Sequence, residues 1–177
     1  MASLGHVAVG LVAARYADGR LGAPGRLLGP MVLWPMLSLL PDADVLGFAL
    51  GVRYGDPWGH RGATHSLAFA LGGGMVAGLV AHRAQVKRGL TAMLVTVVLA
   101  SHGLLDTLTD GGLGVALTWP CSLHRYFAPW RPIPVAPIGL GFLSARGLYC
   151  AAIELGLFAP LWLWALFGRR PDRRQSR

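Results

Sequence analysis

Five apolar stretches alternate with short polar segments along the 177-residue chain. Four of them approach the roughly 20 residues that a helix needs to cross about 30 Å of hydrocarbon. They are residues 27–52, 65–81, 90–108 and 148–167. A fifth, residues 3–14, is short and is expected to cross with its flanks or to sit partly inside the bundle. The pattern predicts an all-α, polytopic transmembrane helical bundle of four to five spans, with an apolar soluble helical core as the alternative.

The composition supports the membrane interpretation. Apolar residues make up 54% of the chain and charged residues only 14%, whereas a typical soluble domain has roughly 25% charged residues. Glycines gather at Gly72, Gly73, Gly74 and Gly78, and small residues of this kind let membrane helices pack closely. We therefore predict a single membrane-embedded domain over residues 1–168, in contact with the lipid bilayer.

The basic residues predict an orientation, because cytoplasmic loops carry an excess of Lys and Arg. With five spans and the N-terminus outside, segments 15–26 and 82–89 and the basic tail 169–177 face the cytoplasm and hold most of the sixteen basic residues. The long segment 109–147, rich in proline and tryptophan, then becomes an outer loop without a span of its own. The prediction is an inner-membrane, multi-pass protein with a cytoplasmic C-terminus.

Two other classes of protein are disfavoured by the sequence. The net charge is +8, but the basic residues lie in short connections and the tail and not along one helix face beside aromatic residues, so no nucleic-acid partner is expected. Cys121 and Cys150 lie far apart with no second pair, which excludes a disulfide framework or a zinc ribbon read from cysteines. Both are expected to be inert packing residues.

Only eight acidic residues are present, and two of them interrupt an apolar run. The segment Leu39-Leu40-Pro41-Asp42-Ala43-Asp44 places two carboxylates where each would cost several kcal/mol if it were left unpaired in hydrocarbon, roughly as for any buried charge. Pro41 disrupts helical hydrogen bonding, so the segment is expected to unwind and to present Asp42 and Asp44 to one cavity. Such a pair suits a divalent cation.

Two further motifs carry histidines. His60 and His65 lie five residues apart, with Gly62 between them allowing a tight turn, and their imidazoles can converge. His102 and Asp106 follow at a spacing that places them on one helix face, with Asp110 a less certain third member. His6 stands in the first apolar stretch.

The orientation predicted from Lys and Arg alone places all these groups on the external side. Imidazole nitrogen together with carboxylate oxygen suits Zn²⁺, Mn²⁺ or Fe²⁺. The predicted cofactor is one or two divalent metal ions, and the predicted ligands are His6, Asp42, Asp44, His60, His65, His102 and Asp106.

Each candidate also has a simpler interpretation. His6 can form a hydrogen bond between two helices, and His60 can pair with Asp56 in a surface loop. Asp110 can cap a turn before Gly111 and Gly112. His82 is expected to be a solvated helix end, and His124 can assist catalysis or merely face water.

The motifs together resemble the YdjM-like family, whose members are described as membrane-bound metal-dependent hydrolases. The matching pieces are His6, L-L-P-D-x-D at 39–44, H-R-G-x-T-H-S at 60–66 and S-H-x-x-L-D-x-x-T at 101–109, with Pro120, Ser122 and Arg125 as a further landmark. The resemblance covers about residues 3–125. It implies an inner-membrane helical protein with a metal-dependent hydrolytic site on the seven ligands named above.

The residues suggest a reaction: a metal-activated water attacks an ester or phosphoester. Asp44 or Asp106 is a candidate general base, and Arg61 and Arg125 are candidates to hold an anionic group. Thr64, Ser66 and Ser101 are expected to orient ligands. The substrate is expected to be a small molecule or lipid-linked. A metal or proton transporter, or a non-catalytic structural membrane protein, remains an alternative.

Overall fold

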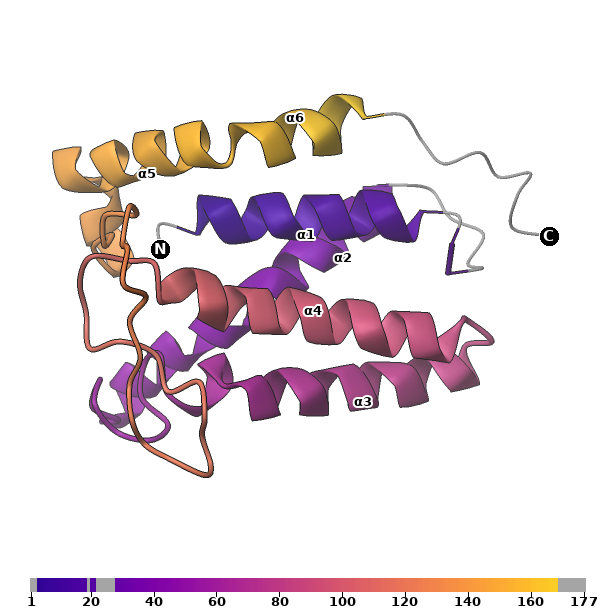
Figure 1. Cartoon of the computed structure of the whole chain (residues 1–177), viewed down its shortest axis with the longest axis horizontal. Helices are drawn as coiled ribbons and strands as arrows, with labels where there is room; N and C mark the ends of the chain where they lie inside the picture. Colours follow the sequence, from indigo (N-terminus) through magenta and orange to yellow (C-terminus); the bar gives the residue numbers. More distant parts are fainter. Residues whose placement is uncertain (1–2, 19, 22–27, 169–177) are drawn as a thin grey trace.

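The computed structural model describes residues 3–18, 20–21 and 28–168, and within them every regular element is a helix (Figure 1). The α-helices are α1 (Leu4–Ala17), α2 (Leu28–Leu39), α3 (Leu67–Arg83), α4 (Arg88–Asp106), α5 (Ala145–Leu157) and α6 (Ala159–Phe167). Three 3₁₀ segments join them: η1 (Leu40–Leu50), η2 (Ala63–His65) and η3 (Gly139–Leu143). The all-α prediction is confirmed for this part of the chain. The predicted tail 169–177 lies outside it.

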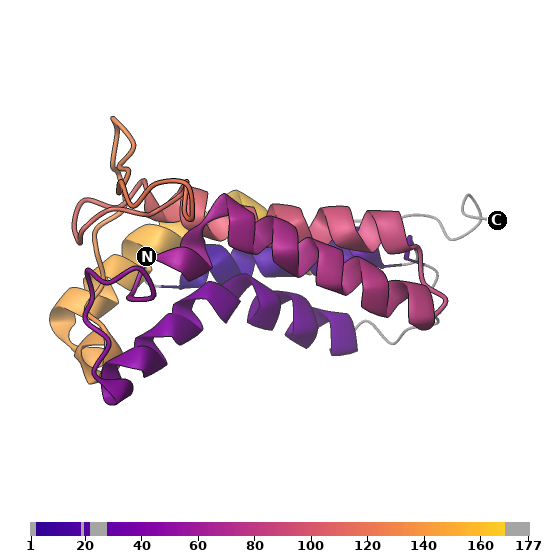
Figure 2. The ribbon, with the colours of Figure 1, turned by 90° about the horizontal axis from the view of Figure 1, so that it is seen from below.

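Helices α3 and α4 run antiparallel as a hairpin, with their short connection at the end opposite the long loops (Figures 1 and 2). Small residues bring them together. A Cβ added at Gly74 would lie 2.7 Å from the Ala92 carbonyl oxygen, and one at Gly78 would lie 3.1 Å from the Ala92 Cβ. Such distances leave no room for a larger side chain, so the prediction that glycines mediate close packing is confirmed at these two positions.

Helix α1 is held on both sides by polar and close-packed contacts. A Cβ at Gly10 would lie 2.6 Å from the Pro35 nitrogen of α2, so the two helices cross in near contact. On the other side the Arg15 Nε donates to the Ala165 carbonyl at 2.7 Å. These contacts fix α1 between α2 and α6.

The bundle interior is apolar away from the loops. Its buried cluster consists of Ala13, Ala14, Ala17, Trp34, Ala70, Leu94, Val95, Val98 and Leu99. Large apolar side chains are exposed on the outer faces, Met36, Met75 and Leu79 among them. Extensive exposed apolar surface is unfavourable in water and typical of lipid-facing helices.

Two segments among the described residues are long and apolar enough to cross a bilayer, Gly29–Leu50 (α2 continued by η1) and Arg88–Asp106 (α4). Helices α5 and α6 meet at a bend of 65° and make a third if they count as one broken span, while α1 and α3 are shorter apolar helices. A membrane protein of several apolar helices is therefore supported. The count of four to five spans stays a prediction.

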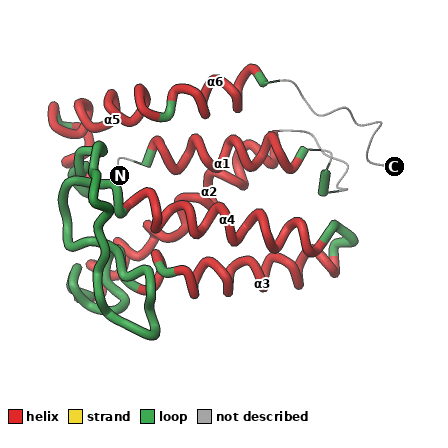
Figure 3. Tube along the Cα trace, viewed as in Figure 1, coloured by secondary structure: helices red, strands yellow, loops and turns green. Residues whose placement is uncertain are grey.

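Residues 107–138 form an irregular segment over one end of the bundle (Figure 3). Isolated bridges join Thr109 to Ile133 and Val115 to Tyr126. Cys150 is buried as predicted, but the prediction for Cys121 was wrong: it is exposed, because it ends the turn at 117–121. Whether this loop lies outside the cell stays a prediction.

Candidate metal centre

The change of helix type at Leu40 positions the two aspartates of the L-L-P-D-x-D motif. Pro41 lies in the first turn of η1, directly after α2, and has no N–H to donate to the preceding turn. Asp42 Oδ1 then lies 3.4 Å from His65 Nε2, and Asp44 Oδ2 lies 3.2 Å from His65 Nδ1. Both carboxylates therefore contact one imidazole, each at a different ring nitrogen. The motif predicted that both would face one cavity, and of the two only Asp42 is among the residues that line the cavity described below.

His65 and His102 meet because η2 lies directly against α4. Gly103 has no side chain, and any Cβ there would overlap the His65 carbonyl. The two Nε2 atoms lie 3.1 Å apart, and both side chains have no exposed surface. The glycine next to His102 is therefore part of what assembles the site.

Hydrogen bonds determine which nitrogen of His102 carries the proton. Its Nδ1 lies 2.7 Å from the Ser38 carbonyl, which can only accept, so Nδ1 donates and the neutral ring presents a lone pair on Nε2. His65 Nδ1 likewise faces Asp44. Two nitrogen lone pairs 3.1 Å apart repel unless a proton or a cation lies between them.

Four side chains fit a divalent cation at this point. Ligand atoms of Asp42, His65, His102 and Asp106 all lie within 4.8 Å of one another. His102 Nε2 is 3.3 Å from Asp42 Oδ1, and His65 Nε2 is 3.6 Å from Asp106 Oδ2. Tetrahedral zinc with bonds of about 2.0–2.1 Å separates its ligand atoms by about 3.3 Å. The donor set and its spacing thus suit the predicted Zn²⁺, Mn²⁺ or Fe²⁺.

Asp44, His60 and His65 form a second group with ligand atoms within 4.8 Å. His60 Nδ1 lies 2.8 Å from Asp44 Oδ1, and the Thr64 hydroxyl donates to Asp44 Oδ2 at 2.7 Å. His60 therefore pairs with Asp44 and not with Asp56, whose carboxylate contacts Arg53. The two groups share His65, so a second ion would have to be bound at its Nδ1 side.

His6 lies beside the first group and not within it. Its ring stacks on His102 with centroids 3.6 Å apart and planes 11° apart, and its Nε2 is 3.3 Å from Asp106 Oδ1. The Ser38 hydroxyl donates to the His6 carbonyl. The helix-helix interpretation of His6 is thus supported by contacts to α2 and α4, although its nitrogen also faces a candidate ligand.

Arg61 is buried with positive φ of 62°. Its Nε lies 3.1 Å from Asp106 Oδ2, and its Nη1 donates to the Thr109 hydroxyl at 2.8 Å and to the Gly111 carbonyl at 3.0 Å. The positive charge of the buried guanidinium compensates the negative charge of the buried carboxylate. Arg61 therefore ties the loop at 109–111 to the candidate metal centre.

A cavity of about 280 Å³ adjoins the first group. Asp42, whose side chain is 26% exposed, lines it together with Tyr54, His60 and Arg61. Gly112 also lines it with a φ of +85°, and a Cβ there would lie 2.9 Å from the Tyr54 hydroxyl. Burial raises the pKa of the Tyr54 phenol, while the Arg61 charge opposes that shift. The phenol is therefore a hydrogen-bond donor at this wall near neutral pH.

The comparisons with known proteins agree with this picture. The profile of the YdjM inner membrane protein family matches residues 1–171. The chain belongs to this family. The inner membrane protein YbcI of Escherichia coli (strain K12) is 41% identical over 149 residues, which cover 81% of this chain and 83% of the relative. No solved structure matches. The predicted family and the inner-membrane location are thereby confirmed; the external position of the site stays a prediction.

In this YdjM family member, Arg125 contacts the loops and not the cavity. It donates to the backbone carbonyls of Tyr54, Asp56, His60 and Gly114, and it is absent from the described residues that line the cavity. Burial lowers the pKa of its guanidinium, but arginine stays protonated. Arg125 therefore positions the segment that carries His60.

Of the predicted orienting side chains, only Thr64 contacts a ligand group. Ser66 accepts from the Phe69 amide and so caps α3, and Ser101 donates to the Val98 carbonyl of its own helix. Asp110 accepts from the Val135 amide and joins two loop segments. Ser38 was missed by the sequence analysis; its one signal is a hydroxyl in an otherwise apolar run.

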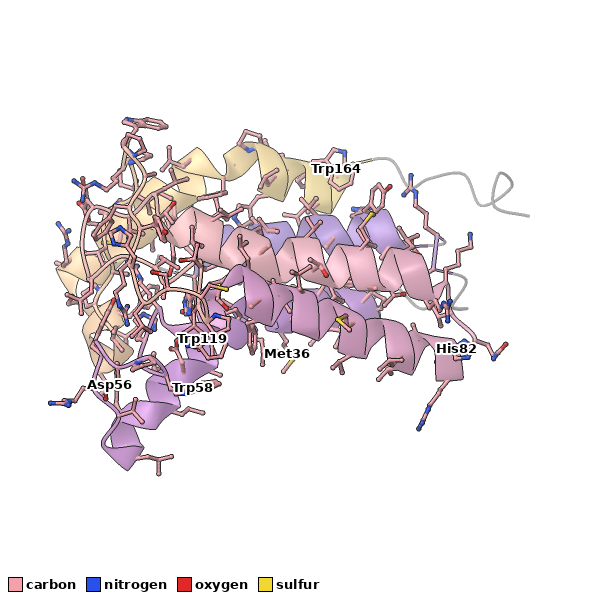
Figure 4. All side chains as sticks on the ribbon, turned by 60° about the horizontal axis from the view of Figure 1, so that its bottom comes forward. Met36, Asp56, Trp58, His82, Trp119 and Trp164 are labelled. Atoms are coloured by element: carbon pink, nitrogen blue, oxygen red, sulfur yellow. The ribbon has the colours of Figure 1, made fainter. Side chains whose placement is uncertain are left out.

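The remaining histidines lie away from the cluster. His82 and His124 are exposed, and His82 lies at the end of the molecule opposite Asp56, Trp58 and Trp119 (Figure 4). The expectation of a solvated helix end for His82 is confirmed. Both residues therefore serve as controls for the buried histidines.

Proposed function

We propose that the protein is a membrane-bound metal-dependent hydrolase of esters or phosphoesters. The observation that carries the proposal is the buried group Asp42, His65, His102 and Asp106, whose ligand atoms lie within 4.8 Å of one another beside a cavity. The substrate is a small molecule or is lipid-linked. Zn²⁺, Mn²⁺ or Fe²⁺ is the expected ion.

A divalent ion in such a site supplies a water of lowered pKa and polarises the ester oxygen. The protein's own residues do the positioning. Asp44 contacts the Nδ1 atom of His65, and the Ser38 carbonyl accepts a hydrogen bond from the Nδ1 atom of His102. Each ring therefore presents its Nε2 atom toward Asp42. Loss of a contact of this kind, made to a metal ligand by a neighbouring group, typically lowers metal affinity about 10–100-fold.

His60 is the side chain best placed to move a proton at the cavity. Its ring lines the cavity while its Nδ1 lies 2.8 Å from Asp44 Oδ1, an arrangement that orients an imidazole for general acid-base work. The predicted base Asp44 would then act through His60 as a positioning residue. The other predicted base, Asp106, is buried against His6 and Arg61, which favours a role as ligand.

The number of ions distinguishes two versions of this proposal. With one ion, His60 and Asp44 form the acid-base pair. With two ions, both residues are ligands of the second. Metal content separates them, because His60→Ala leaves one ion bound in the first version and removes one of two in the second.

The apolar core argues against the transporter alternative. A transit path needs polar groups from the site to the opposite face, whereas the side chains between the site and the far end are the alanines, valines and leucines around Trp34. Arg15, the buried charge of that region of α1, is bound to α6 carbonyls. We further propose that the site faces the external side and that the C-terminus is cytoplasmic, on the distribution of Lys and Arg.

The test is the metal content of detergent-purified protein by elemental mass spectrometry. Wild type is compared with an Asp44→Ala, His102→Ala double variant and with a His82→Ala, His124→Ala control that removes two exposed histidines. We expect a stoichiometric transition metal in wild type and control, and its loss in the first variant. Equal metal in all three proteins, or none in any after reconstitution, would contradict the proposal.

A further inference from the structure

The cavity beside the candidate metal centre is lined by both polar and apolar residues. Asp42, Tyr54, His60 and Arg61 are polar. The apolar lining comprises Val45, Val135, Pro137, Ile138 and Phe142. A substrate that fills such a cavity is expected to have both a polar group and an apolar part.

Exposed leucines directly follow three of the cavity-lining residues in the sequence. Leu46 of η1 is 71% exposed, and Leu140 and Leu143 of η3 are 88% and 73% exposed; each adjoins a residue that lines the cavity. These three residues are here called the rim. Exposed leucines are unfavourable in water and favourable in hydrocarbon. Since η1 belongs to the apolar segment Gly29–Leu50, Leu46 of the rim lies near one end of a candidate span.

The size of the cavity limits what can enter it. Its volume of about 280 Å³ is close to the lower limit of roughly 300–1,000 Å³ for small-molecule sites. A phosphate headgroup fits this space, whereas long hydrocarbon tails do not. Tails attached to such a headgroup would have to lie outside, against the rim.

We propose that the substrate is a phosphate-bearing membrane lipid that enters sideways between η1 and η3, with its headgroup beside Asp42 and its tails on the rim. This inference rests on the proposed hydrolase function for its chemistry. In the reaction the water oxygen bonds to phosphorus while the bond from phosphorus to the leaving oxygen breaks. In the one-ion version of the proposed function, the proton of the water passes to His60 and from there to the leaving oxygen. A phosphate monoester then gives phosphate and an alcohol, and a phosphodiester gives a phosphate monoester and an alcohol.

A second apolar feature supplies the control. A groove of about 790 Å³ is lined by residues of α2, α3 and α4. Its lining includes Leu33, Phe69 and Val76 but no candidate ligand. Gly72 lines it with nothing within 4 Å of an added Cβ, so Gly72→Leu is expected to narrow this groove.

The experiment compares a Leu140→Asn, Leu143→Asn rim variant with Gly72→Leu and wild type. Phosphatidic acid and phosphatidylglycerol in mixed micelles are assayed against their deacylated headgroups, which carry the same phosphate chemistry. We expect the ratio of kcat/KM for lipid over headgroup to fall about tenfold in the rim variant, because a polar rim no longer holds the tails, and to stay unchanged in Gly72→Leu. In parallel, native mass spectrometry counts the lipid retained by metal-free protein.

The outcomes separate the two proposals. An unchanged ratio in the rim variant, or a fall in Gly72→Leu instead, would overturn lipid entry between η1 and η3. Hydrolysis of the headgroups alone by wild type would overturn the lipid substrate and leave the hydrolase standing. Lipid retained by metal-free wild type and lost in the rim variant, without hydrolysis of any substrate, would support the lipid site and contradict the hydrolase.

Discussion

The two ends of the helical bundle are held together by different forces. At the loop end, buried histidines, aspartates and Arg61 contact one another at hydrogen-bond distances. At the other end, α3 and α4 pack through glycine and alanine, with apolar side chains around Trp34. Polar contacts depend on the identity and protonation of each partner, whereas apolar packing depends mainly on volume. Substitutions should therefore change metal binding at one end and stability at the other.

The largest effect is expected for His65→Ala. It removes the imidazole whose two nitrogens contact Asp42 and Asp44, so metal binding should be lost and hydrolysis with it, while helix content persists because the apolar core is untouched. Elemental mass spectrometry and circular dichroism measure the two properties. His124→Ala is the matched control. Full metal content in purified His65→Ala would contradict the claim that metal binding depends on the polar contacts at the loop end.

Metal removal should lower the stability of wild type, because the ion bound at the loop end no longer stabilises the folded state. An ion present at 100 times its dissociation constant stabilises the folded state by about 2.7 kcal/mol. A chelator should therefore lower the apparent Tm of wild type and leave that of His102→Ala unchanged. Thermal unfolding in detergent tests this, and an equal drop in both proteins would show that the chelator acts elsewhere.

Asp44→Asn should weaken metal binding without abolishing it. The carboxylate contacts His65 Nδ1 and His60 Nδ1 but contributes no atom to the first ligand group, so affinity should fall about 10–100-fold. Titration of the metal-free protein measures it, with Asp56→Asn as control. A loss of one of two bound ions would instead favour the two-ion version.

The smallest effect is expected for Gly78→Ala at the apolar end. The added methyl group would lie 3.1 Å from the Ala92 Cβ of α4 and should lower the free energy of unfolding by an amount near the lower end of about 1–3 kcal/mol. Metal affinity should not change. Chemical unfolding measures the stability and metal titration the affinity, with Gly156→Ala as control because nothing lies within 4 Å of a Cβ added at that position. Weakened metal binding in Gly78→Ala would show that the two ends of the bundle unfold as one cooperative unit.

The sequence by itself determined the helices and the residue types of the site. Hydrophobic length predicts apolar helices because a helix satisfies its own backbone in a bilayer. The cost of burying charge made Asp42 and Asp44 candidates for a shared cation, and the spacing of His102 and Asp106 predicted that they lie on one helix face.

The tertiary structure alone decided how these residues are divided. The spacing of His60, His65 and His102 does not reveal that His65 is shared by two groups, that His6 stacks behind His102, or that Arg125 binds loop carbonyls. Nor does it reveal the cavity with its apolar rim. Such contacts join residues up to 100 positions apart, and local periodicity carries no information on which distant side chains meet; that is set by how closely glycines such as Gly103 let the helices approach.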